Sequence, residues 1–225
     1  MLFAGERLEC GEKIVIVKNF LGKGKSGYSY LVEFGEQLAV LKKIHHEPCS
    51  VYCFGPDKLE VQLRDYHILQ ALGIPMPRLF AYDLEREFLV KEYIEGPSLA
   101  QMLACKEIPF RFFRQMIKIC ESAYASHWNL DYMPQNFIVH KGYIVYVDYE
   151  CNPYDWKWDF EHWGIYFWLN QKGMRRFMET GDYGYISVDG WPVKTADIEE
   201  RVLKMKKRLL SQRKNETGGG NTYEY

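Results

Sequence analysis

Three polar side chains in the second half of the chain have the types and spacing that phosphoryl transfer requires. Asp131 and Asn136 lie in the stretch N-L-D-Y-M-P-Q-N, and Asp148 follows in V-D-Y-E. Two short strands, 136–140 and 143–148, are predicted between the loops that carry these side chains. One carboxylate can orient an acceptor hydroxyl, while an amide and a second carboxylate can hold magnesium ions that bridge nucleotide phosphates. Because an Asp-x-x-x-x-Asn spacing is common by chance, its value depends on the upstream residues.

A glycine-rich pattern precedes these residues. Gly22, Gly24 and Gly27 form a G-x-G-x-x-G motif. Residues 28–32 after it have the pattern of a strand, which favours a strand–turn–strand loop over a Rossmann turn, where a helix must follow. Such a loop can fold over nucleotide phosphates and offer backbone N–H groups at close range. The alternative is a tight hairpin with solubilising lysines.

The next strand carries two adjacent lysines. Residues 39–42, A-V-L-K, match the type of strand whose lysine reaches the α and β phosphates of a nucleotide. Because side chains alternate along a strand, Lys42 is expected to enter the site and Lys43 to point away; two surface lysines are the alternative. Lys42 then needs an acidic partner on the following helix. Asp65 and Glu60 are both candidates; the helix pattern favours Asp65, and the choice stays open.

Residues 88–96, F-L-V-K-E-Y-I-E-G, have the pattern of a connector between two lobes. Backbone groups near Glu92 and Ile94 are predicted to pair with the edge of an adenine base. Lys91 lies at a position beside the predicted adenine pocket where an apolar residue is usual. The sequence offers no reason for a lysine there. Further along, Asp159 has two candidate roles, either accepting hydrogen bonds from catalytic-loop N–H groups or capping a helix.

The elements that position these residues follow from the apolar periodicity and the turn residues. Alternating and short apolar runs predict further strands over residues 13–20, 27–33, 37–44, 78–83 and 88–93. Apolar residues at spacings of three and four predict helices over residues 56–72, 98–103, 110–126, 159–178 and 195–213. The Gly-rich, polar residues 215–225 are expected to be disordered.

Composition limits the class of protein. A length of 225 residues is enough for one domain or two small lobes, and a net charge of -1 argues against general nucleic-acid binding. No apolar run long enough for a transmembrane helix and no secretory signal are found, and the six scattered cysteines suit a reduced, cytoplasmic protein. Cys49 and Cys53, near His45 and His46, fit no zinc spacing well, so free thiols are expected.

Taken in this order, the glycine loop, the Lys42 strand, the connector, Asp131 with Asn136, and Asp148 resemble the protein-kinase-like superfamily over roughly residues 20–164. The D-Y-E sequence and the proline inside the catalytic loop are more similar to the aminoglycoside phosphotransferase and choline kinase branch. The resemblance implies an α+β, bilobal fold. A small antiparallel-sheet N-lobe with one helix would cover residues 1–93, a mostly helical C-lobe 94–214, and a disordered tail 215–225.

The resemblance also implies roles for individual residues. Asp131 would be the catalytic base, Asn136 and Asp148 would be magnesium ligands, and Lys42 would anchor the phosphates. Nucleotide contacts would come from the glycine loop, the helix acid and the connector, namely Gly22, Gly24, Gly27, Asp65, Glu92 and Ile94. Asn129 departs from the family, which usually has histidine there, and this puts the rigidity of the loop in doubt.

The implied function is the transfer of the γ-phosphate of ATP, with magnesium, to a hydroxyl group of a small molecule. No nucleic-acid or membrane partner is expected. The alternatives are a small atypical serine/threonine protein kinase of the RIO or KEOPS kind and a nucleotide-binding pseudokinase scaffold. The interval from Asp148 to Asp159 is too short for a regulated activation segment, and no A-P-E sequence follows it. Both features argue against a regulated protein kinase. The sequence does not identify the acceptor or the oligomeric state.

Overall fold

The computed structural model describes residues 1–48, 55 and 57–218. Its contacts divide the chain into two compact units, Met1–Gly96 with Ile138–Cys151, and Pro97–Phe137 with Asn152–Tyr225. The first unit therefore includes a segment, residues 138–151, that the predicted lobes of 1–93 and 94–214 had assigned to the second. The mixed α+β class with an antiparallel sheet is confirmed. The assignment of the units as kinase lobes stays a prediction.

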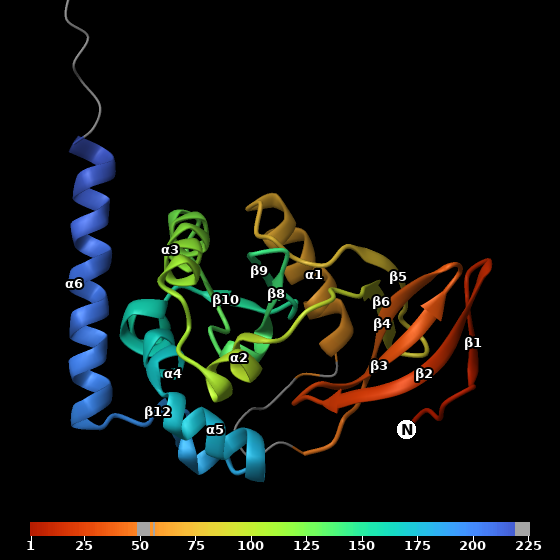
Figure 1. Cartoon of the computed structure of the whole chain (residues 1–225). Helices are drawn as coiled ribbons and strands as arrows, with labels where there is room; N and C mark the ends of the chain where they lie inside the picture. Colours follow the sequence, from red (N-terminus) through yellow and green to blue (C-terminus); the bar gives the residue numbers. More distant parts are fainter. Residues whose placement is uncertain (49–54, 56, 219–225) are drawn as a thin grey trace, which may run out of the picture. The chain divides into compact units, whose positions relative to one another are not determined.

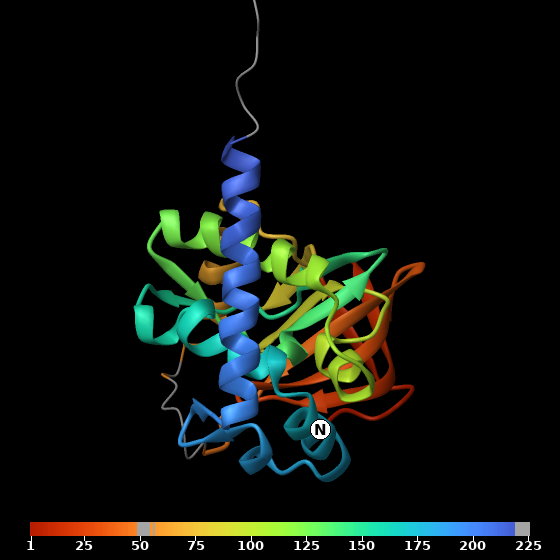
Figure 2. The same ribbon diagram turned by 60° about the vertical axis from the view of Figure 1, so that its left-hand side comes forward.

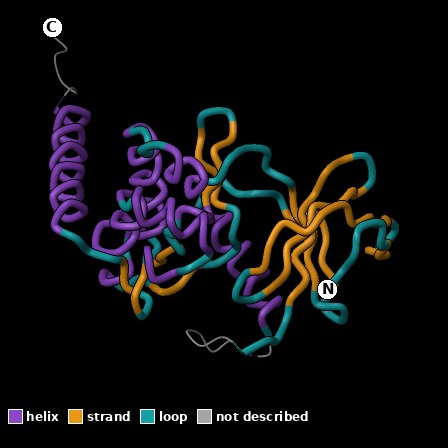
Figure 3. The backbone as a smooth tube through the Cα atoms, turned by 60° about the horizontal axis from the view of Figure 1, so that its bottom comes forward, coloured by secondary structure: helices purple, strands orange, loops and turns teal. Residues whose placement is uncertain are grey.

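The first unit is built on a six-stranded antiparallel sheet in the order β1-β2-β3-β4-β6-β5. Its strands twist strongly against one another (Figures 1 and 3). Five of them were predicted, and the four-residue β1 was missed because it is too short to show a pattern. The bounds are β1 Arg7–Cys10, β2 Lys13–Lys23, β3 Gly27–Phe34, β4 Gln37–Ile44, β5 Leu79–Asp83 and β6 Phe88–Glu92.

The two faces of this sheet bury different sets of residues. One face forms an apolar core that includes Val15, Tyr30 and Leu41. The other face packs with α1, Lys58–Ala71, around Leu89 and Tyr149. Because side chains alternate along each strand, this second face also carries the polar residues described below.

A short hairpin, β8 Phe137–His140 and β9 Tyr143–Tyr146, ends just before Asp148. Its turn residues Lys141 and Gly142 both have positive φ angles, 48° and 85°, as a two-residue type I′ turn requires. The N–H of Tyr146 donates to the carbonyl of Pro75 at 2.8 Å. This contact ties the end of the hairpin to the segment that follows α1.

The second unit is mainly helical. Its α2 begins with the predicted cap, because Ser98 and Gln101 form a reciprocal capping box. The helices are α2 Leu99–Cys105, α3 Phe110–Ala125, a π-helical turn Phe160–Gly164, α4 Ile165–Leu169, α5 Gln171–Thr180 and α6 Ala196–Gly218. Short strands are β7 Trp128–Leu130, β10 Cys151–Pro153, β11 Ser187–Val188 and β12 Trp191–Pro192; 3-10 turns cover Pro134–Asn136, Trp156–Trp158 and Tyr183–Tyr185.

Two helix predictions were wrong in extent. The helix predicted over 159–178 is broken at Asn170, whose side chain accepts a hydrogen bond from the N–H of Gly173 at 2.9 Å and so starts α5. The last helix, α6, continues to Gly218 and therefore includes four residues of the tail 215–225 that was expected to be disordered. Residues 219–225 of that tail, and Cys49 and Cys53, lie outside the described residues.

The long helix α6 runs beside α3 and α4 (Figures 1 and 2). Arg213 Nη2 of α6 lies 3.0 Å from Glu121 Oε1 of α3, and the guanidinium carbon of Arg208 lies 3.8 Å from the centre of the Phe110 ring. Within the part of the chain that the structure describes, no helix combines the length and the apolarity needed to cross a membrane.

Candidate active site

The first unit contains an ion pair between two of the predicted site residues. Lys42 Nζ on β4 lies 3.1 Å from Asp148 Oδ1, although 106 positions separate them in the sequence. Lys42 is 8% exposed, and the side chain of Asp148 is 25% exposed. Burial alone would raise the pKa of Asp148, but the nearby charges of Lys42 and Lys91 lower it below its usual value. The carboxylate is therefore ionised at neutral pH.

Lys91 on β6 is a second buried lysine in this cluster, with 7% of its surface exposed. In the strand register Lys42 lies opposite Leu89 and Lys91 opposite Val40, so the two lysines are diagonal neighbours on one face. The ammonium of Lys91 donates to the carbonyl of Val147 and lies 4.7 Å from the centre of the Tyr149 ring. Burial, and then repulsion from Lys42, lower the pKa of Lys91 to about 7, while Asp148 acts in the opposite direction.

The acid that pairs with Lys42 is thus Asp148, and neither helix candidate takes that place. Asp65 is 2% exposed, and its carboxylate accepts from the N–H of Cys151 at 3.2 Å and from Arg64 at 2.7 Å. Glu60 is exposed. The sequence favoured Asp65 because it lies on the buried stripe of the helix, and that part is confirmed. Its partners are the adjacent Arg64 and a backbone N–H distant in sequence, and helix periodicity does not reveal the second.

The glycine-rich segment forms the strand–turn–strand arrangement that the sequence predicted. Gly24 N–H donates to the carbonyl of Gly27 at 2.8 Å and closes the turn between β2 and β3. Only Gly27 is required by close packing, because a Cβ atom there would lie 2.8 Å from the carbonyl of Lys43 and 3.2 Å from the Lys42 side chain. A Cβ at Gly22 would meet no atom within 4 Å, and one at Gly24 only the Gly27 carbonyl at 3.6 Å. Contact of this loop with phosphates stays a prediction.

The connector begins at the end of β6. The N–H of Glu92 donates to the carbonyl of Arg78 at 2.8 Å, so it is used within the protein. Beyond Ile94, the carbonyl of Glu95 accepts from His140 at 2.8 Å, and Gly96 has a φ of 146° with the carbonyl of Val139 directly against it. The connector is therefore fixed against β8, and its contact with adenine stays a prediction.

The second unit holds Asp131 and Asn136 on one tight loop. Asp131 Oδ1 accepts from the N–H of Met133 at 3.1 Å, and Asn136 Nδ2 donates to the carbonyl of Asp131 at 3.3 Å. The 3-10 turn from Pro134 to Asn136 completes the loop, with proline at its first position. The acid and the amide are thus brought together by local hydrogen bonds.

Neighbouring elements of the second unit hold this loop in place. Asn129 is buried, and its side-chain amide donates to the carbonyl of Asp155 at 2.8 Å. Trp168 donates to the carbonyl of Tyr132 at 2.8 Å, and a Cβ at Gly164 would lie 2.5 Å from the Cβ of Tyr132. The loop is therefore anchored with asparagine at position 129.

Asp159 caps a helical turn, which is one of its two candidate roles. Its carboxylate accepts from the N–H of His162 at 2.7 Å, which caps the π-helical turn, and from the hydroxyl of Tyr154 at 3.4 Å. Among the described residues, none of the donors that reach this carboxylate belongs to the loop 131–136. The predicted support of the catalytic loop by Asp159 is therefore not found.

Each unit contains one oxygen donor of a type that magnesium binds. Asp148 supplies an ionised carboxylate, and the amide nitrogen of Asn136 is used within its own loop, which leaves Oδ1 as the acceptor of that side chain. Magnesium is commonly bound through one or two such oxygens together with phosphates and water. Among the described residues, no three His, Cys, Asp or Glu side chains group closely enough to hold a metal alone.

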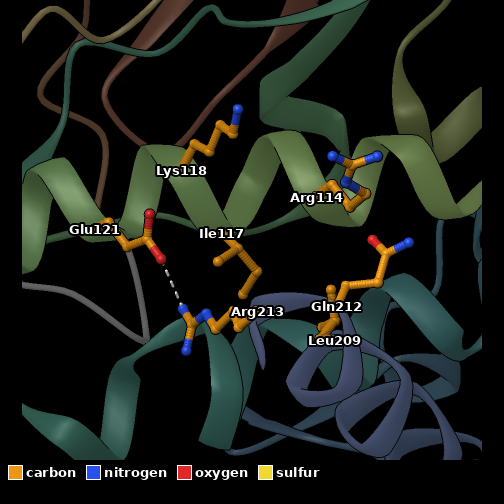
Figure 4. A pocket seen from close by; sticks show the side chains of 7 residues that line it. All are labelled: Arg114, Ile117, Lys118, Glu121, Leu209, Gln212 and Arg213. Atoms are coloured by element: carbon orange, nitrogen blue, oxygen red, sulfur yellow. Dashed lines mark hydrogen bonds and ion pairs between the residues drawn. The ribbon is translucent and has the colours of Figure 1, made fainter. Parts of the chain in front are cut away.

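A small pocket lies elsewhere in the second unit, between α3 and α6. Arg114 and Lys118 line it from α3, and Leu209, Gln212 and Arg213 from α6 (Figure 4). The pair between Glu121 and Arg213 closes one side. None of the predicted site residues lines this pocket.

Neither a protein-family model nor a curated protein matches the sequence. Among solved structures, the chain is similar to that of vaccinia related kinase 3, with a TM-score of 0.46 and 16% sequence identity. The match covers 66% of this chain and 51% of the other, so the chain spans about half the length of that structure.

Proposed function

We propose that this protein transfers the γ-phosphate of ATP, with magnesium, to a hydroxyl group of a small molecule. The observation that carries the proposal is the buried pair of Lys42 and Asp148, joined across 106 positions on the face of the sheet that packs with α1. A lysine and an acid brought together over such a distance fit the pairing of a phosphate anchor with a metal ligand. The local pairing of Asp131 with Asn136 provides the remaining two groups.

In this proposal each residue has one task. Lys42 holds the α and β phosphates, and the glycine loop from Gly22 to Gly27 covers them with backbone N–H groups. Asp131 orients the acceptor hydroxyl and accepts its proton, and its own carboxylate is held in place by the N–H of Met133. The magnesium ion held by Asp148 and Asn136 would neutralise charge on the phosphates. The connector near Glu92 and Ile94 would bind the adenine edge.

A small-molecule acceptor in the cytoplasm, without a nucleic-acid or membrane partner, is the favoured form of this function. A small atypical serine/threonine protein kinase is the second candidate, and autophosphorylation on serine or threonine would favour it. A pseudokinase scaffold is the third, favoured by the unusual residues Asn129, Asp65 and Lys91. It would be supported by nucleotide binding without turnover over a broad panel of acceptors.

The test is the transfer of γ-phosphate from ATP by purified protein to a panel of hydroxyl compounds, with and without magnesium. We expect Asp148→Ala to abolish the transfer while the protein stays folded by circular dichroism. Activity that persists in this variant would reject the role of Asp148. The lack of any thermal shift with Mg-ATP in the wild-type protein would reject nucleotide binding altogether, because a ligand of the native state must raise its stability.

A further inference from the structure

The segment from Val147 to Cys151, which carries Asp148, is tied to three different elements of the first unit. The ammonium of Lys91 on β6 donates to the carbonyl of Val147. The hydroxyl of Tyr149 donates to the carbonyl of Pro77 at 2.7 Å, and Asp65 on α1 accepts from the N–H of Cys151 at 3.2 Å. Tyr149, Cys151, Asp65 and Lys91 are each less than 8% exposed. These contacts fix the backbone on both sides of Asp148.

Lys91 is the least expected of these contacts, because a buried ammonium group is costly. An apolar residue in its place would fill the same space on the strand without that cost. The lysine adds two things that an apolar side chain cannot, a donor for the Val147 carbonyl and a cation over the Tyr149 ring. Both contacts are made to the immediate chain neighbours of Asp148.

We propose that Lys91 is a positioning residue for Asp148. Through the Val147 carbonyl and the Tyr149 ring it holds the carboxylate in the orientation in which Asp148 binds the magnesium ion of a bound nucleotide. This inference rests on the proposed function. It assigns Lys91 no contact with the nucleotide, and it predicts that the segment 147–151 keeps one conformation whether or not a nucleotide is bound.

The test uses three variants of the full chain. Lys91→Met removes the donor and the charge, whereas Lys91→Gln keeps an N–H donor for the Val147 carbonyl and removes the charge. Lys43→Met is the matched control, because Lys43 is the neighbouring lysine on β4 and its ammonium donates to the carbonyl of Arg86 instead. Dissociation constants for ADP are measured by calorimetry in EDTA and in saturating magnesium, and the ratio of the two is the magnesium increment. Melting temperatures without ligand are measured in parallel.

We expect Lys91→Met to reduce the magnesium increment by about tenfold, the usual effect of removing a group that orients a metal ligand. Its affinity for ADP in EDTA should stay within about threefold of wild type, since Lys91 does not contact the nucleotide in this proposal. Lys91→Gln should recover most of the increment, and Lys43→Met should leave it unchanged. If Lys91→Met does not fold, Tyr149→Leu replaces it and Tyr149→Phe becomes its control, because the first removes the ring that Lys91 contacts whereas the second removes only the Pro77 contact.

Three results would overturn the inference. Equal weakening of ADP binding with and without magnesium would mean that Lys91 touches the nucleotide directly. An unchanged increment with a lowered melting temperature would mean that Lys91 serves stability alone. A larger increment in both Lys91 variants would mean that only its charge matters, because removing a cation near Asp148 favours a metal ion. If the wild-type protein binds no ADP in either condition, the proposed function fails as well, which distinguishes that case from the other three.

Discussion

The two polar clusters of this protein are held together in opposite ways. In the first unit, Lys42 and Lys91 come from two strands, and Asp148 comes from a segment distant in sequence. They meet because the strand register and the contacts of residues 147–151 bring them together. In the second unit, Asp131 and Asn136 are five positions apart and bond within one loop. The first cluster therefore depends on the tertiary structure of its unit, while the second is largely a local turn. Mutations should affect the two differently.

The largest effects are expected from substituting one acid in each cluster, because the two acids have different proposed roles. Asp131→Asn should lower the rate of phosphate transfer by about a thousandfold, because a neutral amide cannot accept the proton of the acceptor hydroxyl. Its affinity for Mg-ATP should hardly change. Asp148→Asn should weaken both the transfer and the magnesium-dependent part of nucleotide binding. Rates by radiolabel transfer and affinities by calorimetry measure both effects, and equal loss of Mg-ATP affinity in the two variants would contradict the division of roles.

The next largest effects are expected at two closely packed glycines, one in each unit. Gly27→Ala would place a Cβ 2.8 Å from the Lys43 carbonyl, and Gly164→Ala would place one 2.5 Å from the Cβ of Tyr132. Each should lower the free energy of unfolding by about 1–3 kcal/mol, with Gly164→Ala at the upper end because Tyr132 is fully buried. Urea unfolding measures this. Gly22→Ala is the control and should change stability by less than about 0.5 kcal/mol, since its Cβ would meet open space.

A smaller effect concerns the pH dependence of stability in the first unit. The pKa of Lys91 is about 7 in the folded protein, against a usual 10.5. Between these two values the unfolded chain binds more protons than the folded one, so the free energy of unfolding rises with pH. Between pH 7 and 8.5 the wild type should gain roughly 1–2 kcal/mol over Lys91→Met, as followed by urea unfolding at each pH. Parallel pH curves for the two proteins would show that Lys91 is not the group responsible.

The smallest effect tests the two acids of α1. Asp65→Asn should lower the free energy of unfolding by about 1 kcal/mol, because the buried carboxylate accepts the N–H of Cys151. Glu60→Gln, at an exposed position of the same helix, should be close to neutral. Thermal unfolding of both variants gives the comparison. A larger loss in Glu60→Gln would indicate that the contact between α1 and the Asp148 segment contributes little.

Much of the secondary structure followed from the sequence because its signals are local. The strand–turn–strand pattern around Gly24, the buried stripe of α1 and the Ser98 capping box depend on periodicity and on residues a few positions apart. The break at Asn170 was missed because the apolar pattern continues across it, although asparagine is a good N-cap. The helical residues 215–218 were missed because the composition there suggested disorder.

For the candidate site, the sequence by itself determined which side chains are available and the local turn that joins Asp131 to Asn136. It also determined that Lys42 and Lys43 point to opposite faces of a strand, because that alternation is a property of the backbone. Only the tertiary structure decided that Lys42 pairs with Asp148 rather than with an acid of α1, and that Lys91 has an acceptor for its buried charge. These choices depend on strand register and on packing between segments distant in sequence, and the residue pattern of any one segment does not specify either of them.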